Sequence, residues 1–220
     1  MVTFDAVLFD LDGTLVERTQ DTAALYERAF ERVGVEPFGA PAELWAALDG
    51  PPDPADEVGY LGAGFARLAA QHDRRVDAIG LASAFVDGVD NAQVALRPGT
   101  ERALSAARET APTAILTNGP QSRQADKVDA TGLADRVDAV VYAGDMPRRK
   151  PHAAPFEETL SALEGSGECA LYVGNSLGYD VAGAHNAGLA AAYLDDGDGP
   201  EPYDPEYVLE SLADLPAILQ

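Results

Sequence analysis

Residues 6–15 read Ala-Val-Leu-Phe-Asp-Leu-Asp-Gly-Thr-Leu. An apolar run typical of a buried strand ends in two carboxylates, Asp10 and Asp12, followed by Gly13 and Thr14. Side chains at positions i and i+2 of a strand point to the same face, so the two negative groups would lie close together and repel. This arrangement indicates a cation between the carboxylates or a pair that acts in chemistry. A strand that simply runs into an Asp-Gly turn is the plainer alternative.

The composition is that of a globular chain. Its 220 residues, 46% of them hydrophobic, are enough for one domain, or for a core with a small insert. We expect no membrane helix, because no apolar run approaches about 18 residues, and no secretory signal, because the N-terminus carries Asp5 instead of a basic region. The single cysteine, Cys169, excludes an internal disulfide. We therefore expect a cytoplasmic protein, a monomer or homodimer, with no membrane partner.

The net charge of −22 is extreme, but the acidic residues are dispersed along the chain. Dispersed acids indicate a solubility adaptation more than a docking site for a basic partner. Lysine occurs only at Lys127 and Lys150, and the other basic side chains are arginine. An acid-rich, lysine-poor surface predicts a halophilic protein from a cytosol of very high salt. No basic patch is visible, so we expect no nucleic-acid partner.

The pattern of apolar runs predicts an α/β fold. Buried strands are expected at Ala6–Phe9, Thr113–Leu116, Ala139–Tyr142, Ala170–Val173 and Ala190–Leu194. Helical patterns follow at 101–109, 121–132, 155–164 and 178–188, and residues 195–205 read as a loop. Strands that alternate with helices predict a Rossmann-like parallel sheet with helices on both faces.

About 100 residues separate the first two predicted strands, too many for a simple crossover. Residues 17–94 read as helical throughout, with a break at 50–54. Apolar stripes on these helices are expected to form a core of their own, to which Trp45 also belongs. The stripes comprise Tyr26, Phe30 and Val33, and then Phe65, Leu68 and Ala69. We therefore predict a catalytic core, residues 1–16 and 95–220, and a helical cap insertion, residues 17–94.

Polar side chains follow several of the predicted strands, and the carboxyl edge of a parallel sheet is where ligands bind. The residues expected there are Asp10, Asp12, Gly13, Thr117, Asn118, Lys150, Asn175 and Asp180. Carboxylate and amide oxygens suit Mg²⁺. Beside such a cation Asp10 can attack a phosphoryl group, while Asp12 exchanges protons with the leaving alcohol and then with water. Lys150, Thr117 and main-chain N–H groups near Gly13 and Asn118 would hold the phosphate.

Four segments in order resemble the motifs of the haloacid dehalogenase-like hydrolases. They are Asp10-Leu11-Asp12-Gly13-Thr14, Thr117-Asn118-Gly119, Lys150-Pro151 and Gly174-Asn175 with Asp180. The segment Arg97–Thr100 and residues 117–133 are similar to the phosphoglycolate phosphatase-like subfamily, which carries a helical cap after the first motif.

The resemblance implies a Mg²⁺-dependent phosphatase that hydrolyses a small phosphorylated metabolite, a phosphate monoester, through an aspartyl-phosphate. It implies Asp10 as the nucleophile, Asp12 as the acid and base, and Thr117 and Lys150 as further catalytic residues. Substrate binding is expected at Gly13, Thr117, Asn118 and Lys150. The implied metal ligands are Asp10, the main-chain carbonyl of Asp12, Asn175 and Asp180.

One position departs from the family pattern, because Asn175 stands where many members have aspartate. Asparagine still offers a neutral oxygen, so we expect a metal site that binds more weakly. Asp180 keeps a carboxylate nearby.

Other functions on this fold remain open. A 2-haloacid dehalogenase uses no metal and lacks an acid at the position of Asp12, so Asp12 favours the phosphatase. Carbon–phosphorus cleavage needs a cap lysine, and residues 17–94 contain none. A catalytically weak binding or regulatory protein is supported only by Asn175. A sugar-phosphate mutase uses the same pair of aspartates.

Overall fold

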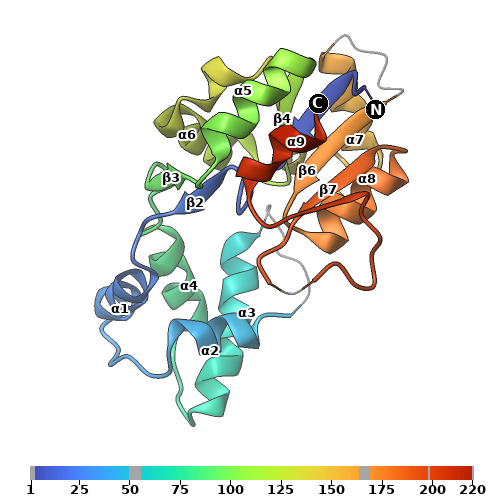
Figure 1. Cartoon of the computed structure of the whole chain (residues 1–220). Helices are drawn as coiled ribbons and strands as arrows, with labels where there is room; N and C mark the ends of the chain where they lie inside the picture. Colours follow the sequence, from blue (N-terminus) through green and yellow to red (C-terminus); the bar gives the residue numbers. More distant parts are fainter. Residues whose placement is uncertain (1–2, 50–55, 164–168, 198, 220) are drawn as a thin grey trace. The chain divides into compact units, whose positions relative to one another are not determined.

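The computed structural model describes residues 3–49, 56–163, 169–197 and 199–219. The chain divides into two compact units (Figure 1). The core unit comprises residues 1–18 and 91–220, and the insert unit comprises residues 19–90. No helix in the described ranges is long and apolar enough to cross a membrane.

A six-stranded parallel sheet forms the centre of the core unit, in the order β5-β4-β1-β6-β7-β8. Its strands are β1 (Ala6–Phe9), β4 (Thr113–Thr117), β5 (Ala139–Tyr142), β6 (Ala170–Gly174), β7 (Ala190–Leu194) and β8 (Tyr207–Leu209). The five predicted strands are confirmed. The edge strand β8 was not predicted, because its apolar run is only three residues long.

Helices cover both faces of this sheet, as predicted. They are α5 (Thr100–Thr110), α6 (Gln121–Thr131), α7 (Ala154–Ala162), α8 (Ala182–Asn186) and α9 (Leu215–Ile218). Alternate residues of β1 serve two separate cores: Val7 and Phe9 pack with residues of α5 and α9, whereas Leu8 packs with residues of α7 and α8. This alternation explains why β1 reads as a continuous apolar run. Short 3₁₀ turns lie at Leu133–Arg136, Ala143–Asp145 and Leu212–Asp214.

The helix predicted over 178–188 is wrong in its first part. A π-helical turn, Leu177–Val181, precedes the shorter α8. The carbonyl of Ser176 accepts hydrogen bonds from the N–H groups of both Asp180 (2.8 Å) and Val181 (3.2 Å), which widens the turn. Apolar periodicity cannot reveal this widening, and π turns occur often at functional sites.

A second small sheet was also missed. Strands β2 (Val16–Arg18) and β3 (Val94–Leu96) pair antiparallel. In the sequence, β2 comes just before the insert unit and β3 just after it. The cap was predicted to be helical from residue 17 to 94, but residues 17, 18 and 94 belong to these three-residue strands of the core unit. They are too short for alternation to be visible in the sequence.

The insert unit consists of α1 (Thr22–Val33), α2 (Pro41–Ala47), α3 (Glu57–Gln71) and α4 (Ala78–Val86). The predicted stripes are confirmed as its core, with Val33 partly buried. Trp45 is a correction, because its side chain is 43% exposed and contacts Phe85 edge-on. Helix α2 buries Leu44, and the next residue along a helix points about 100° away. The predicted break at 50–54 lies outside the described residues.

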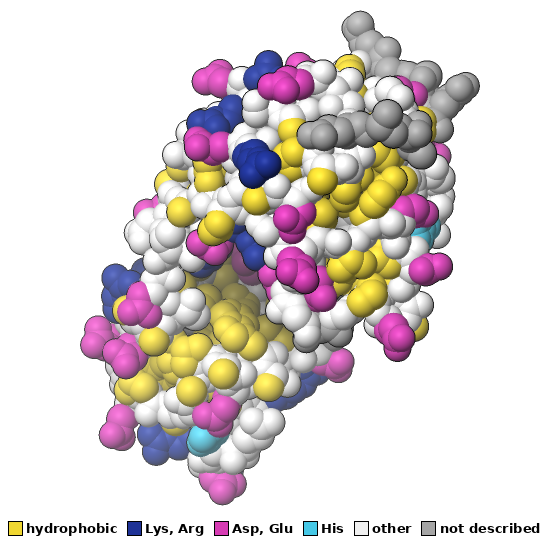
Figure 2. All heavy atoms as spheres, viewed as in Figure 1, with side chains coloured by type: hydrophobic (Ala, Val, Ile, Leu, Met, Phe, Trp, Pro, Cys, Tyr) yellow, Lys and Arg dark blue, Asp and Glu magenta, His cyan; other side chains and the backbone are white. Residues whose placement is uncertain are grey.

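Acidic side chains are dispersed over the visible face of the molecule without forming one block (Figure 2). Both lysines are buried, Lys127 with 6% and Lys150 with 4% of its surface exposed. The surface is therefore poor in lysine, as expected from the sequence. Adaptation to high salt stays a prediction.

We predict that Phe65→Ala destabilises the insert unit. The Phe65 ring is fully buried between the rings of Tyr26 and Phe30, with centroids 5.9 and 6.0 Å away. Removing a buried phenyl ring costs about 3–5 kcal/mol. Urea unfolding followed by circular dichroism measures this cost, and Ile79→Ala, at a residue 54% exposed, is the control. Equal effects of the two substitutions would contradict the assignment of this core.

Candidate active site

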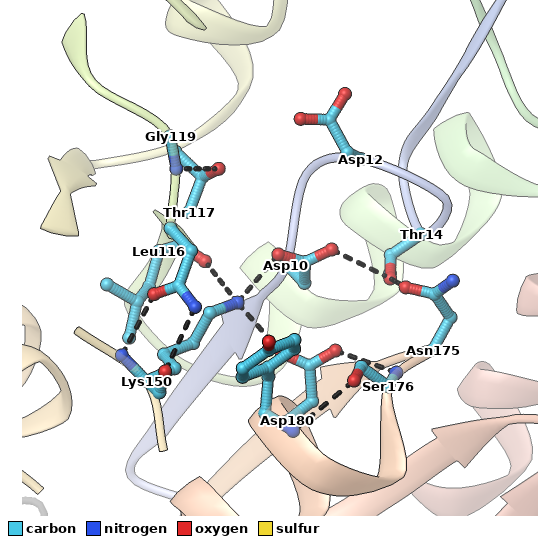
Figure 3. Close-up of polar contacts among 12 residues, drawn as sticks. Asp10, Asp12, Thr14, Leu116, Thr117, Gly119, Lys150, Asn175, Ser176 and Asp180 are labelled. Atoms are coloured by element: carbon cyan, nitrogen blue, oxygen red, sulfur yellow. Dashed lines mark hydrogen bonds and ion pairs between the residues drawn. The ribbon is translucent and has the colours of Figure 1, made fainter. Parts of the chain in front are cut away.

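The candidate site lies at the carboxyl ends of three neighbouring strands, β4, β1 and β6 (Figure 3). Asp10 follows β1 directly, and its N–H still donates to the carbonyl of Val173 on β6 (2.9 Å). Thr117 ends β4, and the segment with Asn175 and Asp180 follows β6. The parallel sheet thus brings together residues that lie more than a hundred positions apart in the sequence.

The Lys150 ammonium is the centre of the hydrogen-bond network. It donates to Asp10 Oδ1 (2.7 Å), Asp180 Oδ1 (2.8 Å) and the Tyr172 hydroxyl (2.7 Å), and lies 3.2 Å from the Leu116 carbonyl. The side chains of Lys150, Asp180 and Tyr172 are deeply buried, and that of Asp10 is slightly accessible to solvent. Removing the ammonium would leave two carboxylates buried without a partner, and removing both carboxylates would leave the ammonium buried without one.

Asn118 holds Lys150 in place. Its side-chain oxygen accepts from the Lys150 N–H (2.8 Å), and its Nδ2 donates to the Lys150 carbonyl (3.0 Å). Lys150 follows β5 only after a loop, so this double contact fixes the lysine against the end of β4. The substrate contact predicted at Asn118 is through main-chain N–H, whereas both ends of its side-chain amide are engaged with the Lys150 backbone.

Burial and charge shift the ionisation of this network. Desolvation by burial raises the pKa of Asp10 from 3.8 to about 7, although Lys150 opposes the shift. Burial alone would lower the pKa of Lys150, but the neighbouring Asp10 and Asp180 outweigh it and raise the pKa. Burial, and then the charges of Asp180 and Asp10, raise the pKa of Tyr172 well above its usual value. Lys150 therefore stays protonated and Tyr172 neutral around neutral pH.

Two oxygens next to Thr14 fit a hard cation such as Mg²⁺. The Thr14 hydroxyl lies 3.3 Å from Asp10 Oδ2 and 3.2 Å from Asn175 Oδ1, and its single proton can serve only one of them at a time. Carboxylate and amide oxygens are suitable ligands for Mg²⁺. No cluster of three His, Cys, Asp or Glu side chains suited to a metal occurs in the described ranges. The set beside Thr14 contains one carboxylate, that of Asp10.

Asp180, also expected as a metal ligand, has both oxygens engaged with the protein. Oδ1 accepts from Lys150 and from the Tyr172 hydroxyl, and Oδ2 accepts from the Ser176 N–H (2.9 Å). The π-helical turn aims this carboxylate at Lys150. Of the two expected ligands after β6, Asn175 is therefore the one whose oxygen shares the Thr14 hydroxyl with Asp10.

Gly13 is required for the approach of Asn175. Its φ of +80° is in the left-handed region, and a Cβ there would lie 2.5 Å from Asn175 Nδ2. Its N–H donates to the Val16 carbonyl (2.9 Å), so the predicted phosphate contact at Gly13 has a competing partner within the chain.

Asp12 lies apart from Asp10 and points away from it (Figure 3). Lys127 Nζ contacts both of its carboxylate oxygens, at 2.7 and 2.9 Å, and Gln124 Nε2 donates to Oδ2 at 2.6 Å. Gln124 also donates to Thr117 Oγ1 (2.8 Å). Neither Gln124 nor Lys127 was predicted as a site residue from the sequence. Their i, i+3 spacing on a helix that begins just after Thr117-Asn118-Gly119, and the rarity of lysine, were the available signals.

Arg97 is a further contact that the sequence did not reveal. It donates to the carbonyl of Gly13 and forms an ion pair with Asp196 (2.7 Å), which follows β7. The hydrogen bond to Asp196 raises the pKa of Arg97, and the same bond lowers the pKa of Asp196. Arg97 thus links the loop that carries Asp12 to the segment that follows β7.

Comparisons with known proteins agree on one family. The family model of the haloacid dehalogenase-like hydrolases, described as a hydrolase, matches residues 4–188. A phosphoglycolate phosphatase of Cereibacter sphaeroides is 32% identical over 202 residues, which cover 87% of this chain and 85% of that protein.

Solved structures show the same fold. The crystal structure of a predicted phosphoglycolate phosphatase from Haemophilus somnus 129pt superposes with a TM-score of 0.76 at 24% identity, with 100% of both chains covered. A HAD phosphatase from Thermococcus onnurineus gives a TM-score of 0.67 at 24% identity and covers 98% of this chain and 97% of its own.

We predict that the stability of the metal-free Asp10→Asn variant relative to the wild type is higher at about pH 8 than at about pH 5. The ordinary pKa of an aspartate is 3.8, whereas that of Asp10 in the folded protein is about 7. Between these values the folded protein binds more protons than the unfolded chain, so the wild type loses stability as the pH rises, and the loss is complete above about pH 7. Asparagine does not titrate and escapes this loss.

The change in the stability difference between the two proteins is expected to be roughly 1–3 kcal/mol across this range. Chemical unfolding in chelator at both pH values measures it. Asp126→Asn, at an exposed position of α6, is the control. A difference that does not vary with pH would show that the Asp10 carboxyl is not perturbed.

Proposed function

The chain belongs to the haloacid dehalogenase-like hydrolases, and we propose that it is a Mg²⁺-dependent phosphatase that hydrolyses a small phosphate monoester through an aspartyl-phosphate. The observation that carries this proposal is the contrast between two carboxylates two residues apart. Asp10 is buried against Lys150, whereas the Asp12 side chain is 49% exposed and held by other residues. One is suited to attack phosphorus and the other to exchange protons.

In the first half-reaction a carboxylate oxygen of Asp10 attacks phosphorus, and the bond from phosphorus to the ester oxygen breaks. Asp12 gives its proton to that oxygen, which leaves as the alcohol. In the second half-reaction Asp12 takes a proton from water as the water oxygen attacks phosphorus. The acyl-phosphate bond then breaks, which releases inorganic phosphate and restores the Asp10 carboxylate.

The positive charge at the site has two sources in this proposal. Mg²⁺, held by Asp10, the main-chain carbonyl of Asp12 and Asn175 Oδ1, would lower the repulsion between the phosphate and the Asp10 carboxylate when bound. Lys150 supplies a fixed ammonium beside Asp10 (2.7 Å), and Asp180 keeps that ammonium charged and in place. The Thr117 hydroxyl and main-chain N–H groups would hold the phosphoryl oxygens.

The insert unit is proposed to act as a cap that covers the substrate and excludes water during turnover. Its side chains would select the substrate. The relatives named phosphoglycolate phosphatase make 2-phosphoglycolate the first compound to test. We place the protein in the cytoplasm, as a monomer or homodimer.

The dehalogenase alternative is disfavoured by the carboxylate of Asp12, and by its two partners on α6, which hold it beside Thr117. The weak binding protein is disfavoured by the buried Asp10–Lys150 pair, whose desolvation has no purpose in mere folding.

We predict that Asp10→Asn abolishes the hydrolysis of p-nitrophenyl phosphate in Mg²⁺ while the fold is retained. The amide is not a nucleophile, so the rate should fall by at least about 1,000-fold, consistent with the loss of covalent catalysis. Release of p-nitrophenolate measures the rate, and circular dichroism checks the fold. Excess chelator should likewise stop the wild type. Undiminished activity of the variant would remove Asp10 as the nucleophile, and undiminished activity in chelator would favour the dehalogenase chemistry.

We predict that Asn175→Asp tightens Mg²⁺ binding about tenfold or more, which corresponds to about 1.4 kcal/mol. The substitution adds a carboxylate of nearly the same shape beside Asp10. Isothermal titration calorimetry with MgCl₂ measures the affinity without turnover. Gln121→Glu adds the same charge at an exposed position of α6 and serves as the control. Equal affinities in the wild type and Asn175→Asp would show that residue 175 is not a ligand.

A further inference from the structure

We propose that Gln124 and Lys127 of α6 are positioning residues that hold the Asp12 carboxylate and aim the Thr117 hydroxyl at the phosphoryl group. This inference rests on the proposed phosphatase function and extends it to two residues outside the four sequence motifs. Both residues belong to the core unit, as do Asp12 and Thr117, and both point toward the site from one face of the helix.

The two partners of the Lys127–Asp12 ion pair differ in how deeply their side chains are buried. The Lys127 side chain is 8% exposed, whereas that of Asp12 is 49% exposed. An exposed carboxylate ordinarily gains little from an ion pair, because water solvates it equally well. Here the ammonium belongs to a buried side chain and reaches both oxygens of Asp12, at 2.7 and 2.9 Å. The lysine therefore acts together with Gln124 to set the direction of an otherwise exposed side chain.

Gln124 connects Asp12 to Thr117. Its Nε2 carries two protons, and it donates to Asp12 Oδ2 (2.6 Å) and to Thr117 Oγ1 (2.8 Å). The opposite amide orientation would place Oε1 against the Asp12 carboxylate, so the network fixes the amide as described. Oε1 itself is buried and has no hydrogen-bond partner among the described residues.

An unpaired buried acceptor costs about 1–3 kcal/mol. Gln124 is 4% exposed, so bulk solvent has little access to this oxygen. A residue that only filled space on α6 would be better as leucine or methionine at this position. We explain the glutamine by the two hydrogen bonds of its Nε2, which place the Asp12 carboxylate and the Thr117 hydroxyl relative to each other.

The hydroxyl of Thr117 is oriented as a consequence. Its oxygen accepts from Gln124 Nε2 (2.8 Å) and from the Gly119 N–H (3.3 Å). With both lone-pair directions occupied, its own proton must be donated outward, to a group that the protein does not supply in these contacts. A phosphoryl oxygen of the substrate is such an acceptor.

The test compares two substrates whose leaving groups differ in their need for a proton. p-Nitrophenolate is a weak base and leaves almost without protonation, whereas phenolate needs the general acid. Lys127→Met and Gln124→Met misplace Asp12, so the kcat/KM for phenyl phosphate should fall about 10- to 100-fold more than that for p-nitrophenyl phosphate. Both substrates carry the same phosphate, so the ratio cancels any general loss of phosphate attraction or of folded enzyme.

The two variants should differ in one further measurement. Only Gln124→Met frees the Thr117 hydroxyl from its orientation, so the inhibition constant of inorganic phosphate should rise more in this variant than in Lys127→Met. Asp126→Asn, exposed on the same helix, should change neither the substrate ratio nor phosphate inhibition.

Equal losses with both substrates in the two methionine variants would overturn the proposal and leave a merely structural role for α6. Failure of the proposed function itself appears differently, since the wild type would then show no Mg²⁺-dependent hydrolysis of either ester or Asp10→Asn would remain active. If one methionine variant does not fold, the substrate ratio of the other decides the matter.

Discussion

The ion pairs of Lys150 with Asp10 and Asp180 are the constraint on which the rest of the site depends. An ammonium and two carboxylates buried together are stable only if each is held within hydrogen-bond distance of the others. The order β4-β1-β6 supplies the two aspartates from adjacent strand ends, and Asn118 ties the lysine's backbone to β4. The π-helical turn is part of this arrangement, because it points Asp180 toward the lysine.

The two lysines of this chain pair with the two aspartates to which the proposed function gives catalytic roles. In a protein of charge −22, each buried ammonium neutralises a carboxylate that the proposed chemistry needs: Lys150 beside Asp10 and Lys127 beside Asp12. With all five groups ionised, Asp180 leaves the cluster with one net negative charge. The neutral Asn175 keeps it at that value, whereas an aspartate would double it. A metal of double positive charge then makes the site positive toward a phosphate dianion.

The sequence predicted most of the sheet because its central strands are buried on both faces and therefore read as apolar runs. Asp10, Thr117, Lys150 and the residues after β6 could be placed at one edge because parallel strands end together. The strands β2 and β3, the π turn and the contacts of Arg97 could not be predicted, since they depend on pairing and side-chain geometry that leave no periodic signal. Gln124 and Lys127 were not predicted as site residues, because a polar helix face is expected to be exposed to solvent until its neighbours are known.

The two oxygens of Asp10 have different neighbours, and this difference bears on how one residue serves as both nucleophile and metal ligand. Oδ1 contacts Lys150, whereas Oδ2 lies on the side of Thr14 and Asn175. Under the proposed function, Oδ2 is the oxygen suited to the metal. Oδ1 is then the attacking atom, because an ammonium beside it can also attract the phosphoryl group. The separation requires that Asn175 stay close to Asp10, which the absent side chain of Gly13 permits.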